Sequence, residues 1–479
     1  MKPAPLIIAF VVLAVLGALV WYTEENPPET GEQKPEIISV KADDIVRVTI
    51  SRPRKDAITL ERGKDGEWRF GEPYTFPVGK SPVNTMISNL ASMKADRLVD
   101  EQVRNWDPYG LDGAGALEVS AVVKQEQPGD GEEDEKEAEE GESAPKTYRI
   151  VFGNDTPTGE GVYARLEGES RLFTVFSYVK SGFEKEIFDL RDKKLLQVDE
   201  DKISRVTVSV GRRSIEFGKS GDDLWQILKP KPARADNFAV GDLARSLRTA
   251  EMVSVHEEGG EAPGKYRFRR PFAVAEIVDE VGAHTLTIAK SNDDSYYAKS
   301  SDLGGVYEVS STMAEGLDKP LDDFRNKKLF DFGFKEIAAL DLRDGDTRLR
   351  VEKKEEKWVL SSEGDRELDS EKVQIVIDSL RSLAATGFPS DDAADQSQYG
   401  LDQPAIEAEV TVAEDESSEK VLISALSNER VYTARENQPT TYEVEKSAAE
   451  EIRRAIQELP REKEESEDSA SEGEADSEG

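Results

Sequence analysis

The chain has 479 residues, room for roughly three or four ordinary domains, and it contains no cysteine. A disulfide framework, a thiolate nucleophile and a cysteine-built zinc site are therefore excluded. With 63 Lys and Arg against 99 Asp and Glu, the net charge of −36 disfavours a nucleic-acid partner.

The N-terminal segment at residues 5–22 carries no charged side chain and is just long enough to span a bilayer as a helix. Lys2 precedes it and Glu24 follows it, a bias that places the N terminus in the cytoplasm. We expect a cytoplasmic stub at 1–4, a transmembrane signal anchor at 5–22 and a linker at 23–39. The remainder would then be periplasmic, in a single-pass protein of the inner membrane. A cleaved signal peptide and a buried core helix are the alternatives.

Internal repetition is the strongest signal in the rest of the sequence. Trp68, Trp225 and Trp358 each end a pattern of three short strands, in which apolar residues alternate with polar ones between tight turns. At one fixed interval after each tryptophan, a leucine lies within a helical pattern. Start signals such as Asp236 precede these patterns. More strand patterns follow, with tyrosines or phenylalanine at matching places in all three copies.

These observations predict an α+β fold with three tandem copies of an antiparallel-sheet-plus-helix module, preceded by the transmembrane helix. The modules are expected at 40–196, 197–330 and 331–460. An acidic insertion at 125–145 and an acidic tail at 461–479 are both interpreted as disordered chain, with a docking segment for a basic partner as the alternative. The recurring residues are interpreted as the repeat core, with a ligand-binding aromatic strip as the alternative. They are Trp68, Leu90, Tyr109, Tyr163, Phe173, Trp225, Leu247, Tyr266, Tyr297, Tyr307, Trp358, Leu380, Tyr399, Tyr432 and Tyr442.

A basic motif closes the first two copies and stands out in an acidic chain. It contains Arg191, Lys193 and Lys194 in the first copy, and Arg325, Lys327 and Lys328 in the second. The structural interpretation places these cations at a helix C terminus, with the arginines paired to acids of the adjoining module. The functional alternative is contact with anionic lipid or a protein partner. In the third copy Pro460 interrupts the motif, as expected for a terminal repeat.

The order and spacing of these motifs resemble a known family. Residues 109–112 read Tyr-Gly-Leu-Asp, residues 162–165 read Val-Tyr-Ala-Arg, and residues 189–196 contain the basic motif. This series is similar to domain-of-unknown-function family 4340 (DUF4340). The resemblance implies a single N-terminal membrane helix and a gene often placed beside ABC-2 transporters similar to the gliding-motility system. It also implies an accessory role, with a transporter permease as a protein partner, and it brings no catalytic residue.

The sequence offers little for catalysis, and no cofactor, metal site or catalytic residue is predicted. His256 and His284 have no His or Cys at ligand spacing, and His284 is interpreted as an exposed or strand-edge residue. The first hypothesis is a non-enzymatic, membrane-anchored binding or scaffold protein of the cell envelope. The alternatives are a hydrolase or binder of an envelope glycan that uses paired carboxylates, and a purely structural spacer.

Overall fold

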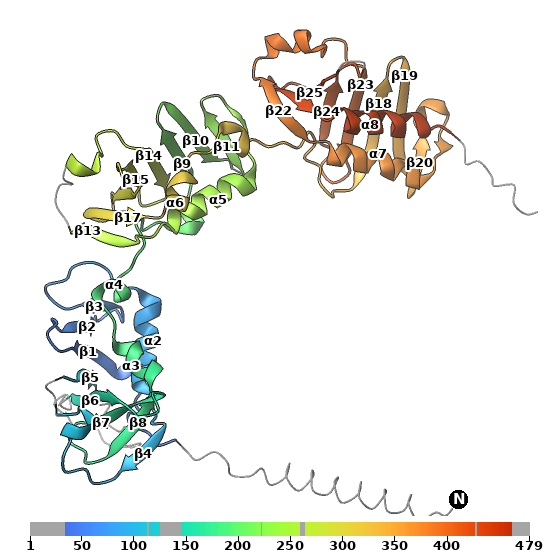
Figure 1. The fold of residues 1–479 in the computed structure, drawn as a ribbon. Coiled ribbons are helices and arrows are strands. Elements are labelled where there is room, and N and C mark those ends of the chain that lie inside the picture. Colours follow the sequence, from blue (N-terminus) through green and yellow to red (C-terminus); the bar gives the residue numbers. More distant parts are fainter. Residues whose placement is uncertain are drawn as a thin grey trace, which may run out of the picture. The chain divides into compact units, whose positions relative to one another are not determined.

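The computed structural model describes residues 34–112, 115–124, 145–221, 223–258, 264–426 and 429–461. It divides into two compact units, the first ending at Lys193 and the second beginning at Lys194. The first unit contains one sheet and the second contains two, and every strand pairing is antiparallel. Figure 1 shows the three sheets, each with helices against one of its faces.

The first unit is built on an eight-stranded sheet with the order β3-β2-β1-β5-β6-β7-β8-β4. Apolar side chains alternate with polar ones along β1 and β5, because one face of the sheet packs on the helices. The elements are β1 (Ile45–Ser51), β2 (Ile58–Arg62), β3 (Trp68–Phe70), α2 (Lys80–Ala91), β4 (Arg97–Asp100), β5 (Leu117–Val123), β6 (Lys146–Asp155), β7 (Gly161–Leu166), β8 (Leu172–Phe176), α3 (Ser177–Phe183) and α4 (Ile187–Leu190).

The second sheet has nine strands in the order β12-β11-β10-β9-β14-β15-β16-β17-β13. Its main helix begins at the predicted position, because the side chain of Asp236 accepts hydrogen bonds from the backbone N–H groups of Phe238 and Ala239. The elements are β9 (Arg205–Val210), β10 (Arg213–Lys219), β11 (Trp225–Lys229), β12 (Ala233–Arg234), α5 (Asn237–Arg248), β13 (Ser254–Glu258), β14 (Ala273–Val278), β15 (Ala283–Lys290), β16 (Tyr296–Ser300), β17 (Gly305–Val309) and α6 (Ser311–Glu315).

The third sheet repeats this nine-stranded order as β21-β20-β19-β18-β23-β24-β25-β26-β22. Two helices of thirteen residues, α7 and α8, pack against each other and bury their apolar faces in the core of this sheet. The elements are β18 (Ile337–Asp344), β19 (Thr347–Lys354), β20 (Lys357–Leu360), β21 (Arg366–Glu367), α7 (Ser370–Ser382), β22 (Ala385–Ser390), β23 (Ile406–Val412), β24 (Ser418–Ile423), β25 (Val431–Arg435), β26 (Thr441–Val444) and α8 (Lys446–Glu458).

The three sheets share one topology. The strand after the long helix lies at the far edge of its sheet. Of the four later strands, the first pairs with the first strand of the copy, and the others follow by hairpins out to that edge strand. The helix therefore crosses the sheet and covers the core. The prediction of repeated sheet modules is confirmed.

The predicted fold class is wrong in its N-terminal part. No helix among the described residues has the length and apolar composition that a membrane crossing requires. The segment predicted to cross, residues 5–22, lies outside the described residues. Over the described residues, the fold class is therefore corrected to three antiparallel sheets with helices, none of which is suited to cross a membrane. Most of the predicted acidic insertion and tail also lie outside the described residues, although β5 and β6, which flank the insertion, pair along their length.

Candidate functional site

The residues predicted as the repeat core occupy two environments. The leucines of the three long helices have no exposed surface, and the aromatic residues of the penultimate sheet strands are almost as deeply buried. Trp225 is buried, whereas Trp68 and Trp358 lie half-buried at the edges of their cores. The fully or nearly fully buried anchors are Leu90, Leu247, Leu380, Phe173, Tyr307 and Tyr442.

The remaining predicted tyrosines form one ring pair in each copy. The ring centroids are 5.0 Å apart for Tyr109 and Tyr163, 4.9 Å for Tyr266 and Tyr297, and 4.8 Å for Tyr399 and Tyr432. In the first unit this pair belongs to a small cluster separate from the main core. Sequence spacing identified the positions, but the contact between them became visible only in the fold.

The basic motifs divide into buried arginines and more exposed lysines. Arg191 and Arg325 are 3% and 4% exposed, and each guanidinium lies 4.0 Å from a phenylalanine ring, that of Phe76 and that of Phe388 respectively. Lys194, Lys327 and Lys328 are exposed, and Lys193 is half-buried over the ring of Phe188. The arginines, rather than the lysines, are therefore the structural part of the motif.

Arg325 is fixed by a buried ion pair with the third sheet. Its guanidinium binds both carboxylate oxygens of Asp391 and donates to the Thr440 hydroxyl at 3.4 Å. Burial raises the pKa of Asp391, but the Arg325 guanidinium outweighs this effect and holds that pKa below its ordinary value. The structural interpretation of the basic motif predicted that Arg325 would pair with an acid of the adjoining module, and Arg325 makes this contact with Asp391.

A second group of charges holds the segment after Arg325. Asp331 pairs with Arg234 of β12 and, at 2.8 Å, with Arg435 of β25. The backbone N–H of Asp331 donates to Glu419 of β24 at 2.6 Å, and Arg435 lies 3.2 Å from the same carboxylate. This segment, which we call the connector (residues 325–331), is therefore bound by side chains of both sheets.

Backbone pairing completes the attachment of the connector. Arg325 forms a bridge with Ala235, just before α5, and Lys328 forms one with Ala384, just after α7. The Ala385 N–H donates to the Lys327 carbonyl at 2.7 Å. At the start of the second unit, Lys194 forms the corresponding bridge with Glu251, just after α5.

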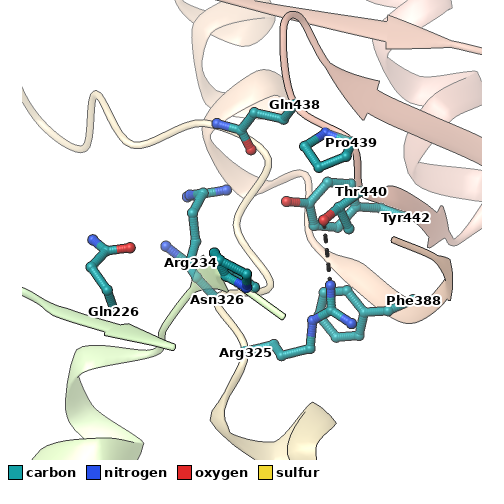
Figure 2. Close-up of a pocket in the computed structure, with 11 residues that line it drawn as sticks. Gln226, Arg234, Arg325, Asn326, Phe388, Gln438, Pro439, Thr440 and Tyr442 are labelled. Carbon is teal, nitrogen blue, oxygen red and sulfur yellow. Dashed lines mark hydrogen bonds between the residues drawn. The ribbon is translucent and has the colours of Figure 1, made fainter. Parts of the chain in front are cut away.

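A small pocket of about 220 Å³ opens beside this connector (Figure 2). Gln226 and Arg234 come from the second sheet, Asn326 from the connector, and Gln438 and Tyr442 from the third sheet. The pocket and the ion pairs together form the candidate functional site.

The second sheet contains a separate buried charge cluster that the sequence interpretation missed. The Nδ1 atom of His284 lies 2.7 Å from Asp302 and its Nε2 atom lies 3.3 Å from Asp279. The His284 side chain is only 11% exposed, so its interpretation as an exposed or strand-edge residue is wrong. Burial lowers the pKa of His284, but the carboxylates of Asp302 and Asp279 outweigh it and raise that pKa.

The same two aspartates also hold the entry segment of the second unit. Asp302 accepts a hydrogen bond from the Gln197 N–H at 2.7 Å, and Asp279 accepts one from the Asp199 N–H at 3.2 Å. Burial raises the pKa of Asp279, but the backbone N–H groups it accepts from lower it to about 2. No group of His, Asp or Glu side chains within the described ranges is arranged to hold a metal ion.

Comparison with known proteins identifies the family. The model of a domain of unknown function (DUF4340) matches residues 68–271, 225–404 and 358–466. Each match begins at one of the repeat tryptophans, which agrees with the three sheets. No curated protein and no solved structure matched the chain. The three matches together span most of the sequence, and the chain belongs to the DUF4340 family.

Proposed function

We propose that this chain is a non-enzymatic scaffold that presents its second and third modules to a protein partner in a fixed arrangement. The observation that carries the proposal is the connector at 325–331, which is bound by the backbone and side chains of both sheets of the second unit. A linker that merely separates two modules makes few contacts with either of them. The family resemblance suggests an envelope component such as a transporter permease as the partner, and a location outside the cytoplasm.

The charge environment of the acids supports this proposal over a glycan hydrolase. A glycosidase needs one carboxyl group whose pKa is raised, so that it can act as the general acid. Within the described residues, the buried carboxylate of Asp279 and the half-buried carboxylates of Asp302 and Asp391 each have a pKa below the ordinary value. These groups are held ionised by cations and backbone N–H groups, which suits a structural role.

A distance measurement across the connector tests the fixed arrangement. The chain has no native cysteine, so spin labels attach only at introduced ones. Arg212, in the turn between β9 and β10, and Arg348, on β19, are both exposed, and their replacement by cysteine allows electron–electron double resonance. We expect one narrow distance distribution that broadens in Asp391→Asn. A broad distribution in the parent chain would favour a flexible spacer.

A partner-recovery experiment in the native host tests the binding role. Cross-linked, tagged full-length protein is compared with Asp391→Asn and with Asp341→Asn, which breaks only an exposed ion pair with Arg350. We expect one envelope protein to be recovered equally by the parent and Asp341→Asn, and several-fold less by Asp391→Asn. Equal recovery by all three proteins would refute a role in partner binding for the ion pair that fixes the connector. If no protein is recovered specifically, the chain is better explained as a purely structural spacer.

A further inference from the structure

The pocket beside the connector has walls from two sheets and few unpaired charges. Figure 2 shows Gln226 on one side, Gln438 and Tyr442 on the other, and the two arginines between them. Arg325 is paired with Asp391 and Arg234 with Asp331. Because both guanidinium charges are already neutralised by carboxylates, the pocket is not suited to an anion.

The pocket does contain polar groups that lack partners in the described chain. Tyr442 is 3% exposed, yet its hydroxyl makes no hydrogen bond with a described residue and points into the pocket. The equivalent Tyr307 of the second sheet donates its hydroxyl to the Gly304 carbonyl. The side-chain amides of Gln226 and Gln438 are likewise without a hydrogen bond to described residues. The Tyr442 hydroxyl is not among the fully buried polar atoms that lack a partner, so it is accessible from the pocket and can donate a hydrogen bond to a ligand there.

The hydrogen-bonding capacity of these side chains matches that of a peptide group. Each glutamine amide offers both a donor and an acceptor, as a peptide group does, and the Tyr442 hydroxyl can donate to a carbonyl oxygen. Pro232, Pro439 and the Tyr442 ring supply apolar walls. Arg325 covers one face of Phe388 at 4.0 Å, so the Tyr442 ring is the aromatic wall that remains, and a sugar probe is included in the test below.

We propose that this pocket binds a short uncharged peptide segment of a protein partner. One peptide group lies between Gln226 and Gln438, and its carbonyl accepts a hydrogen bond from Tyr442. The volume of about 220 Å³ is below the roughly 300–1,000 Å³ of drug-sized pockets, so the pocket suits a loop tip rather than a helix. This inference rests on the proposed scaffold function and names where the partner is held.

Fluorine NMR of the full-length chain tests the pocket directly. The protein is labelled with 3-fluorotyrosine at its 13 tyrosines, and Tyr442→Phe assigns the signal of Tyr442 by its disappearance. The probes are N-acetyl-alanine N′-methylamide as the blocked peptide, methyl glucoside as the sugar, and inorganic phosphate as the anion. We expect the blocked peptide alone to shift the Tyr442 signal, with the signal of Tyr307 unchanged as the internal control.

Glutamine variants then test the assigned contacts. Gln226→Ala and Gln438→Ala should each weaken binding of the blocked peptide about three- to tenfold, as expected for one lost hydrogen bond. Gln374→Ala, on the exposed face of α7, should leave it unchanged. A Tyr442 shift with methyl glucoside or phosphate instead would overturn the peptide assignment, and no shift with any probe would overturn the pocket. Either failure leaves the partner-recovery experiment to decide the scaffold function separately.

Discussion

Replacing Asp391 with asparagine should weaken the joint between the second and third sheets. The change keeps the shape of the side chain but removes the bidentate carboxylate from the guanidinium of Arg325, which is 4% exposed. Arg325 then keeps only the exposed carboxylate of Asp322, 3.7 Å away. Removing one partner of a buried ion pair typically costs about 3–5 kcal/mol. Because the Asp391 side chain is 25% exposed, water can partly replace it, and we expect a loss nearer about 2–3 kcal/mol.

Hydrogen exchange reports this loss at the joint itself. The Ala385 N–H donates to the Lys327 carbonyl and the Leu329 N–H donates to the Leu383 carbonyl, so both amides exchange when the connector opens. A loss of about 2–3 kcal/mol would accelerate their exchange roughly 30- to 150-fold if local opening governs it. Calorimetry should show that the melting temperature of the second unit is lowered by about 5–10 °C.

A matched variant separates the buried pair from surface charge in general. Asp341 pairs with Arg350 at 2.7 Å, but their side chains are 37% and 52% exposed. Asp341→Asn should therefore cost less than about 1 kcal/mol and leave exchange at Ala385 unchanged. If Asp391→Asn behaves like this control, the ion pair does not hold the joint and the reasoning is refuted.

Three further variants test other parts of the fold. Folding raises the pKa of His284, so protonated His284 stabilises the folded state fully below about pH 6.5, and this contribution is lost as the pH rises through the folded pKa. Urea unfolding from neutral to alkaline pH should show the loss in the parent and not in His284→Gln. Gly153→Ala would place a methyl group 2.1 Å from the Tyr109 carbonyl oxygen, so urea unfolding should show the free energy of unfolding of the first unit reduced by about 1–3 kcal/mol. The control Gly182→Ala meets no atom within 4 Å and should not lose stability by collision. Replacing 125–145 with a short turn should change the melting temperature little, since β5 and β6 already pair, and a large drop would show that the segment packs.

The repeated sheets could be predicted because their signals are local. The Asp344-Gly345 turn, with Gly345 at φ +60°, and the N-cap at Asp236 depend on neighbouring residues alone. Likewise, the alternation of apolar side chains in β9 and β18 follows directly from the period of a strand.

The candidate site was less accessible because its partners are distant in sequence. Arg325 stood out as part of a basic motif, but Asp391 lies 66 residues away and nothing local marks it among many acids. His284 was misjudged although one of its partners, Asp279, lies only five residues away, because the position of the other depends on strand pairing. Its nearer partner, Asp302, follows β16, and only the pairing of β15 with β16 brings the two together. The pocket itself exists only once both sheets are folded, so no sequence pattern could indicate it.

The use of an arginine at the joint is itself informative about function. A buried ion pair adds little stability over a well-packed apolar pair of similar size, but a bidentate guanidinium fixes the orientation of its partner. In Arg325→Met with Asp391→Leu, we therefore expect stability close to that of the parent, with the methionine packed on Phe388. The distance distribution between the labelled sheets should nevertheless broaden, because an apolar contact can slide where a forked hydrogen bond cannot. A double variant that is stable and equally narrow would mean that packing and the Asp331 contacts alone set the geometry, so the buried charge would have no role in the scaffold.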